Sequence, residues 1–453
     1  MQSTPPVVPG LPLVGNMLQF ARQRHQFLQA AHKQYGSVFS FKLGRQPVVV
    51  LIGPEYHQFF FVETDKLLNI EKPYRNLAAL FGKVAFLAPP DVYQEQKPIL
   101  YAPFRPEKMQ HYVTIMQREI QRWLDSLGDS GEIDLTAEMS KLVQDVAGNT
   151  LMGEDFQRKA GREFWDLYAA LGKALNTVLP PDWPLPKNIR RDRAKKRMSE
   201  ILQPIIAERR KHPERYDDFL QDFVNTRCRS GAEADDETII SLIRGLLFAS
   251  HETTAGQAAW TIIEILRHPE YAALVQQEIA THAPVDVPID GKLLRRLEHI
   301  FYAVREIERM HPSANMLMRM TNEEIEIGGY RIPKGWLVMT AAGLAHRSPE
   351  LFAEPDRFDP LRFAPGRAED RQHGYALIGF GGGKHKCAGM NFANNEMIVI
   401  TLMLFQQFDL ELVTKNPQTN YGLGAGRPEA TIVRYRRKHA VEAQPEPEVV
   451  SAV

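Results

Sequence analysis

The chain has 453 residues, and its 55 basic side chains equal its 55 acidic ones, so the formal net charge is zero. A neutral chain lacks the general attraction to phosphate backbones on which most nucleic-acid-binding proteins rely, so no nucleic-acid partner is expected. An apolar fraction of 44% supports a sizeable core and argues against global disorder. The two cysteines cannot form a disulfide framework, and we expect a reducing compartment, the cytoplasm.

The first 21 residues carry no charged side chain, but their composition does not suit a membrane-spanning helix. Such a helix needs about 20 mostly apolar residues. Four prolines and several polar residues interrupt this stretch, and no basic segment precedes an apolar run as it does in a signal peptide. We therefore expect no integral membrane segment.

Two segments have the pattern of β-hairpins. Residues 37–52 alternate apolar and polar side chains before a turn at Gly44 and end in a β-branched run. Residues 324–338 alternate in the same way around the turn Gly328-Gly329. The sequence predicts two hairpins and hence a small β-rich part.

Helical periodicity dominates the rest of the chain. The longest helical pattern covers residues 237–267, with Asp235 placed to cap its start and Pro269 following its end. Residues 298–310 and 388–408 also have helical periodicity. Because no Gly/Ser linker and no repeat divides the chain, we predict a mainly α fold with a smaller β-rich subdomain.

The predicted domain is single and covers residues 1–438, including the Pro-rich segment 1–20. The remaining residues, 439–453, contain Pro and Glu and are predicted to form a disordered tail.

The chemistry of the sequence centres on the glycine-rich segment 379–389, which contains Cys387. A Walker-type phosphate loop is excluded, because Ile378 and His385 occupy positions that require Gly and Ser or Thr. An inert buried cysteine is the usual role of a lone Cys, and Cys228 has no motif around it. An inert role does not explain the glycines and three potential cations near Cys387. A cysteine at a helix N-terminus receives backbone N–H groups and the helix dipole, which favour a thiolate able to bind iron.

The pattern Phe380-x-x-Gly383-x-His385-x-Cys387-x-Gly389 resembles the haem-binding loop of the cytochrome P450 monooxygenases, with His where Arg is commoner. The resemblance covers nearly the whole chain. It implies haem b between the long central helix and the helix after the loop, with Cys387 as the iron ligand. Phe380 and Gly389 belong to the implied cofactor site.

The long helix contains Ala249-Ser250-His251-Glu252-Thr253-Thr254, which resembles the family's oxygen-activation motif. Oxygen activation consumes protons, which a carboxylate and a hydroxyl in an apolar helix can relay. Glu252 and Thr253 are therefore the predicted catalytic residues. Gly256 and the threonines also weaken the helical ladder and would open a groove for oxygen. Without the cysteine loop, an ordinary amphipathic helix would be the preferred interpretation.

Two further motifs resemble the family's structural triad. Glu306 and Arg309 stand three residues apart before His311-Pro312, and Arg362 follows in Pro360-Leu361-Arg362-Phe363. An i,i+3 pair of this kind is ordinarily a surface ion pair. The resemblance gives Glu306, Arg309 and Arg362 a structural role outside the catalytic set.

The resemblance also assigns residues to the propionates of haem and to the substrate. Propionates need cationic partners, and His385, Arg319 and Lys97 stand at the corresponding positions. The residues expected to contact substrate are Tyr74, Phe81, Phe86, Ala249, Met316 and Met318. Core filling is the alternative role of the two methionines.

Within the family, the likeness is greatest to the sterol 14α-demethylases. Tyr74 and the run 81–84 look like their substrate-side loop, and residues 179–193 look like their lid region. Two departures weaken the transfer of this activity. The loop reads Lys83-Val84-Ala85-Phe86-Leu87 without the usual Gly, Tyr and Asp, and Glu252 stands where those enzymes have His.

The predicted function is a haem-thiolate monooxygenase that inserts one atom of O2 into a C–H bond of a bulky lipophilic substrate. That substrate would be a terpenoid, a sterol or a fatty-acid-like molecule. Sterol 14α-demethylation is the second hypothesis, a non-catalytic haem sensor or carrier is the third, and peroxide-driven oxidation is a minor variant.

The electron donor must be a separate protein, because the chain contains no reductase domain and no ferredoxin cysteines. A ferredoxin, a flavodoxin or a reductase would dock on a basic patch at Lys384 and Lys386. Solvated lysines without a partner are an equally weighted alternative.

Overall fold

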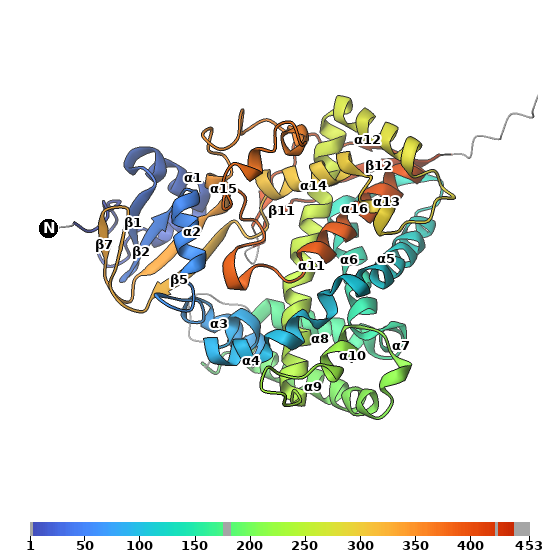
Figure 1. Ribbon diagram of the computed structural model, residues 1–453, viewed down its shortest axis with the longest axis horizontal. Helices are drawn as coiled ribbons and strands as arrows, with labels where there is room; N and C mark the ends of the chain where they lie inside the picture. The colour runs from blue at the N-terminus through green and yellow to red at the C-terminus, as the bar shows by residue number, and fades with distance from the viewer. Residues whose placement is uncertain (1–2, 175–182, 422–424, 439–453) are drawn as a thin grey trace, which may run out of the picture.

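The computed structural model describes residues 3–174, 183–421 and 425–438, apart from the side chain of Phe86. The predicted tail at 439–453 and part of the predicted lid region at 179–193 lie outside the described residues. Helices form the larger part of the molecule, and the strands of the largest sheet lie near its N-terminal end (Figure 1). The predicted class, mainly α with a smaller β-rich part, is confirmed.

The helices are Met17–Tyr35 (α1), Pro54–Val62 (α2), Arg75–Phe81 (α3), Pro90–Tyr101 (α4), Pro106–Ser126 (α5), Leu135–Met152 (α6), Glu154–Phe156 (α7), Arg162–Ala174 (α8), Pro186–Lys211 (α9), Phe219–Asn225 (α10), Asp236–Arg267 (α11), Pro269–His282 (α12), Gly291–Leu294 (α13), Glu298–Met310 (α14), Ala342–Ala345 (α15) and Met390–Gln407 (α16). The strands are Val38–Leu43 (β1), Gln46–Leu51 (β2), Leu68–Asn69 (β3), Ser130–Asp134 (β4), Met316–Thr321 (β5), Ile325–Ile327 (β6), Tyr330–Ile332 (β7), Leu337–Ala341 (β8), Phe408–Leu412 (β9), Thr419–Asn420 (β10), Arg427–Pro428 (β11) and Ile432–Arg437 (β12). No helix among the described residues is long and apolar enough to cross a membrane.

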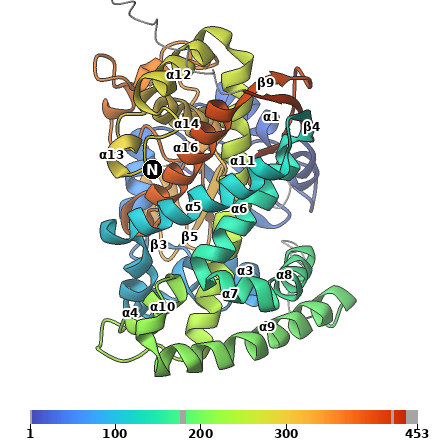
Figure 2. The same ribbon diagram turned by 90° about the vertical axis from the view of Figure 1, so that its right-hand side faces the viewer.

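Helix α11 runs through the middle of the molecule, and α16 lies beside it (Figures 1 and 2). The carboxylate of Asp235 accepts a hydrogen bond from the backbone N–H of Thr238 at 2.7 Å and so caps α11, as the sequence predicts. The helix ends before Pro269, which begins α12. Most of α11 is buried and belongs to the largest apolar core. The helix is therefore a rigid axis on which a central site can be built.

The largest sheet has the strand order β1-β2-β8-β5-β3. Its first two strands form the predicted hairpin, with Gly44 in the turn. The second predicted hairpin is shorter than residues 324–338, because only β6 and β7 pair around Gly328-Gly329, whose φ angles are +59° and +77°. The next strand, β8, turns away and pairs with β2 and β5 instead. Because β8 pairs with both β2 and β5, it makes β5 part of the large sheet.

Candidate functional site

The loop that carries Cys387 is closed by its own backbone and fastened from outside by α4. The N–H of Cys387 donates to the carbonyl of Phe380 at 2.9 Å. The hydroxyl of Tyr93 donates to the carbonyl of Lys384 at 2.8 Å, and that of Tyr101 donates to the carbonyl of Lys386 at 3.2 Å. Two tyrosines thus fix the peptide groups on both sides of His385, while the lysine side chains stay exposed.

Glycine is required at position 383 for two independent reasons. Its φ of +61° lies in the left-handed region, which L side chains rarely adopt. A Cβ at this position would also lie 2.6 Å from the carbonyl oxygen of Phe61 in α2. The loop therefore packs against α2 more closely than any residue with a side chain would permit.

Cys387 lies in the loop three residues before α16, which begins at Met390 rather than at residue 388. Its side chain is exposed, yet burial raises the pKa of its thiol. Glu308 raises this pKa further, whereas the N–H of Gly389 and the charge of Lys386 oppose the rise. The backbone donor at Gly389 thus favours the thiolate, as the sequence predicts, while desolvation opposes it and has the larger effect on the pKa.

The surroundings of Cys387 fit a haem group. A side chain that is accessible but desolvated faces a recess rather than bulk water. A Cβ on Gly389 would come within 3.4 Å of Phe104 and 4.0 Å of the sulfur, so glycine keeps the space beside the sulfur free. A metal bound to the sulfur would supply the positive charge that the protein alone does not provide.

The middle of α11 is the second accessible part of the interior. Ala249 is exposed and Thr253 is half-buried, although Leu247 and Ala255 on either side are buried. The Thr253 hydroxyl donates to the carbonyl of Ala249 at 2.6 Å, and the hydroxyl of Ser313 donates to the carbonyl of Thr253 at 3.1 Å. The predicted oxygen motif therefore faces open space, although α11 continues through it as one helix. The oxygen groove stays a prediction.

Glu252 lies between two basic side chains. Its Oε2 is 2.8 Å from a guanidinium nitrogen of Arg427, and its Oε1 is 3.9 Å from Nδ1 of His251. Its negative charge, together with burial, raises the pKa of the Tyr168 hydroxyl. No local pattern in the sequence indicates Arg427, which stands 175 positions after Glu252.

Two of the predicted propionate partners meet at the segment before β3. His385 Nε2 lies 2.7 Å from Oδ2 of Asp65, and its ring stacks on Tyr93 with 4.3 Å between centroids. Arg319 Nε donates to the hydroxyl of Thr64 at 2.9 Å. Burial lowers the pKa of Arg319 to about 10, against the influence of Asp65 and a neighbouring tyrosine. Sequence reasoning missed Asp65, which lacks any motif.

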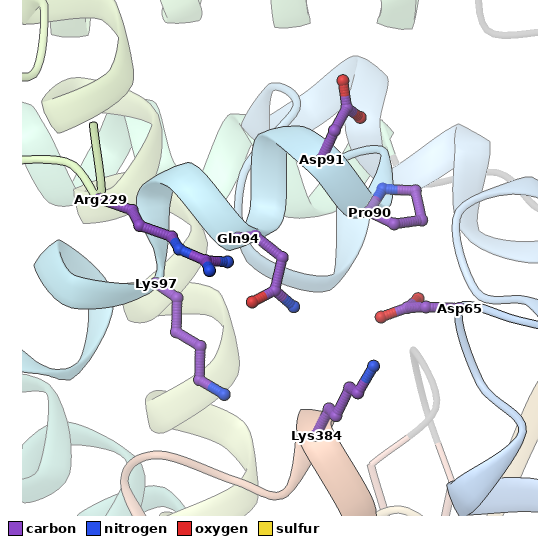
Figure 3. Close-up of a pocket in the computed structure, with 7 residues that line it drawn as sticks. All are labelled: Asp65, Pro90, Asp91, Gln94, Lys97, Arg229 and Lys384. Carbon is purple, nitrogen blue, oxygen red and sulfur yellow. The ribbon is translucent and has the colours of Figure 1, made fainter.

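Lys97 lies at a surface pocket of about 440 Å³ rather than deep in the interior (Figure 3). Its Nζ is 5.5 Å from the ring centroid of Tyr101 and 5.9 Å from that of Tyr93. The pocket is lined by Asp65, Pro90, Asp91, Gln94, Lys97, Arg229 and Lys384. The Tyr93 ring therefore stacks on His385 and also lies near the ammonium group of Lys97, which lines the surface pocket.

Two predicted substrate residues lie together. Phe81 is buried against Phe248 of α11, with 4.6 Å between ring centroids, and Tyr74 packs on the same apolar cluster. The hydroxyl of Tyr74 accepts a hydrogen bond from the N–H of Met318 at 3.0 Å. Phe248, one residue before Ala249, was not predicted. It links this cluster to the oxygen motif.

The side chains of the two predicted methionines pack against a different cluster, and the side chain of Phe86 cannot be placed. Met316 and Met318 alternate with Arg319 along β5 and pack against the apolar cluster between α1 and the large sheet. That packing is the alternative considered for the methionines. The side chain of Phe86 lies outside the described part of the structure.

Glu306, Arg309 and Arg362 meet in the interior, and all three side chains are fully buried. Arg309 donates to both oxygens of Glu306 at 2.8 Å, and Arg362 donates to Glu306 Oε1 at 3.2 Å. Arg309 also donates to the carbonyls of His346 and Pro355. The arrangement ties α14 to the segment that leads toward the cysteine loop.

Comparison with known proteins agrees with this geometry. The family model described as Cytochrome P450 matches residues 5–432. A protein of Arabidopsis thaliana named sterol 14-demethylase is 32% identical over 444 residues, which cover 94% of this chain and 90% of that protein. A sterol 14alpha-demethylase of Mycolicibacterium vanbaalenii is 30% identical and covers 94% of this chain, with 96% of its own length matched.

The fold has a solved counterpart in the retinoic-acid-bound cyanobacterial CYP120A1. The TM-score is 0.86, and the match covers 97% of this chain and 100% of that one at 23% identity. This likeness concerns the fold. The family model and the relatives confirm the predicted family resemblance. The chain belongs to the cytochrome P450 family, the haem-containing monooxygenases.

Proposed function

We propose that the Cys387 thiolate would hold the haem iron and that Glu252 and Thr253 supply the protons that oxygen activation consumes. The supporting observation is that the thiol and the 249–253 stretch of α11 are both accessible within an otherwise buried interior. Haem b held at Cys387 supplies the iron that binds and activates dioxygen. In this proposal, residues 1–438 form one domain, and the cytoplasm is its location.

The overall reaction is R–H + O2 + 2e⁻ + 2H⁺ → R–OH + H2O, in which one oxygen atom enters a C–H bond and the other leaves as water. The two electrons come from an external protein donor. Thr253 and Glu252 are both half-buried in α11, and Glu252 is paired with Arg427. Protons then move from solvent through the carboxylate and the hydroxyl. Replacement of Glu252 would slow this delivery without removing the haem.

The propionates of haem would be held by His385 and Arg319. Both side chains already lie near Thr64 and Asp65, so their positions are fixed before any ligand binds. Lys97 is a weaker candidate because it packs on Tyr93 and Tyr101 at the surface pocket. An exposed patch of Lys384 and Lys386 would bind the acidic face of a ferredoxin, flavodoxin or reductase.

The substrate is a bulky lipophilic molecule in this proposal. The cluster around Tyr74, Phe81 and Phe248 presents aromatic and aliphatic surface beside the oxygen motif. A non-sterol lipid or terpenoid is the first candidate. Sterol 14α-demethylation is the second, favoured by the names of the relatives and weakened by Glu252 and by the run 83–87.

A titration panel distinguishes the two substrate candidates. Purified haem-loaded protein is titrated with a sterol such as obtusifoliol, a terpenoid and a fatty acid while the spin state is followed by absorbance. We expect a spin-state change and hydroxylated product with the terpenoid or the fatty acid. Binding of the sterol with loss of its methyl group would instead establish the second candidate. No turnover of any compound with a competent redox system would favour a haem sensor or carrier.

A further inference from the structure

Strand β11 crosses α11 directly beside the oxygen motif. Glu252 and Gly256 stand four residues apart, on one face of the helix. A Cβ on Gly256 would lie 2.9 Å from the carbonyl oxygen of Gly426 and 3.0 Å from Cβ of Arg427. Glycine therefore permits a contact between backbones, one turn after the acidic residue.

From this crossing point, Arg427 reaches back to Glu252. Its guanidinium nitrogen is 2.8 Å from Oε2 of Glu252, and the two side chains are 36% and 33% exposed. His251 and Tyr168 also face the carboxylate, and His251 Nε2 hydrogen-bonds to the carbonyl of Ser140 at 2.9 Å. Arg427 thus gives Glu252 a permanently charged partner that solvent can reach.

The segment that carries Arg427 is fastened to the segment that holds Thr253. Gly426 N–H donates to the carbonyl of Ser313 at 3.1 Å, while the Ser313 hydroxyl donates to the carbonyl of Thr253 at 3.1 Å. Ala314 and Ala425 form an isolated antiparallel bridge next to these bonds. The acid and the alcohol are therefore positioned by one pair of adjacent segments.

We propose that Arg427 is a positioning residue for oxygen activation, which holds the Glu252 carboxylate at the solvent end of the proton relay. This inference rests on the proposed function, because it assigns Arg427 a role through Glu252. A charge-assisted hydrogen bond restricts the carboxylate to one orientation. A half-exposed ion pair contributes little to the stability of a fold. The effect of losing Arg427 is therefore expected in proton delivery rather than in folding.

The experiment uses the haem-loaded full chain with NADPH, a surrogate ferredoxin and its reductase, without added substrate. It measures the share of NADPH recovered as hydrogen peroxide. Reduction of O2 by two electrons and two protons gives peroxide, whereas four electrons and four protons give two waters and require O–O cleavage. The variants are Arg427→Met, Arg427→Lys, Glu252→Gln and the double variant Arg427→Met/Glu252→Gln.

We expect Arg427→Met to raise the peroxide share by about threefold or more, since proton delivery by a placed side chain contributes about 100-fold or more to rate. Arg427→Lys should restore most of the wild-type value. The double variant should match Glu252→Gln alone, because Arg427 acts through that residue. Arg434→Met is the matched control, since Arg434 pairs with Glu132 and Glu411 on another sheet and should change nothing.

The possible failures are distinguishable. If Glu252→Gln leaves the peroxide share unchanged, the proton relay of the proposed function is wrong. If Glu252→Gln raises it but Arg427→Met does not, or if the two effects add in the double variant, the role of Arg427 is wrong. A crystal structure of Arg427→Met gives a second readout. The Glu252 carboxylate should leave its place beside β11, and an unchanged carboxylate would overturn the inference.

Discussion

His385 Nε2 lies 2.7 Å from the carboxylate of Asp65, 320 positions earlier in the chain, and both side chains are almost completely buried. Asp65 adopts a φ of +71°, in the left-handed region. Its Oδ1 has no hydrogen-bond partner among the described residues. The hydrogen bond between them thus fixes the cysteine loop to the segment before β3, at a backbone position that L side chains rarely adopt.

Substitution of Asp65 separates the charge of the pair from the backbone strain. Asn tolerates the left-handed region, so Asp65→Asn removes the charge alone and should lower the free energy of unfolding by about 1–3 kcal/mol. Asp65→Ala should cost about 1 kcal/mol more, because alanine is disfavoured at this φ. Urea unfolding measures both values. Equal stability of the two variants would show that the backbone conformation contributes nothing.

The buried Glu306–Arg309 pair predicts a large loss on truncation. Arg309→Ala leaves the buried carboxylate of Glu306 with the guanidinium of Arg362 and the N–H of Asp359, and should cost about 3–5 kcal/mol of unfolding free energy. Arg436→Ala, at an arginine that is 75% exposed beside Asp409, should cost less than about 1 kcal/mol. A loss of similar size in both variants would refute the structural role of the triad.

Replacement by alanine should have opposite effects on stability at two glycines of α11, Gly256 and Gly245. Gly256→Ala places a Cβ 2.9 Å from Gly426, and the overpacking of about 1–3 kcal/mol exceeds the helix-propensity gain of about 0.5–1 kcal/mol. At Gly245 the nearest atom, in Val84, is 3.6 Å away, so Gly245→Ala should be neutral or stabilising. Thermal unfolding measures the difference. Equal melting temperatures would contradict the close contact of β11 with α11.

The buried carboxyl of Glu396 in α16 should make its contribution to the stability of the fold depend on pH. It is 2% exposed, and burial raises the pKa of its carboxyl from 4.5 to about 8. Between about pH 4.5 and 8 the folded chain therefore holds a proton that the unfolded chain has released. Because the unfolded state binds fewer protons in this window, stability must fall as the pH rises through it.

The variant Glu396→Met keeps the approximate volume and removes the titrating group. It should exceed the wild type in unfolding free energy by about 1–3 kcal/mol at pH 8 and by much less at pH 5. Urea unfolding across this range measures the difference. If the difference in unfolding free energy between the variant and the wild type is the same at pH 5 and pH 8, the Glu396 carboxyl is not neutral in the folded protein.

Local patterns explain how much of the fold could be predicted. Residues 298–310 are helical as predicted, and the capping Asp235 and the turn at Gly44 act where the sequence places them. These features depend on neighbours in sequence. The hairpin predicted over 324–338 extended too far, and the pairing of β8 with β2 was not predicted, because β2 lies almost 300 residues earlier and no local signal selects it.

The same distinction applies to the site. Cys387 and the Glu252-Thr253 pair could be recognised because each stands in a compact motif. Asp65 and Arg427 could not, since each acts only through a residue far away in the chain. The pKa of the Cys387 thiol depends on the fold for a related reason. Burial by the tertiary structure, which the sequence does not show, outweighs the local backbone donor.

The central claim is that the Cys387 sulfur is the iron ligand, and the absorption spectrum of reduced, carbon-monoxide-bound protein tests it most directly. We predict the long-wavelength Soret band of a thiolate-ligated haem in the wild type and its loss in Cys387→Ser. The Cys228→Ser variant is the control, because that cysteine lies outside the 379–389 loop and has no motif around it, so its substitution should leave the band unchanged. A band typical of imidazole ligation in the wild type, or a thiolate band that survives in Cys387→Ser, would contradict the assignment.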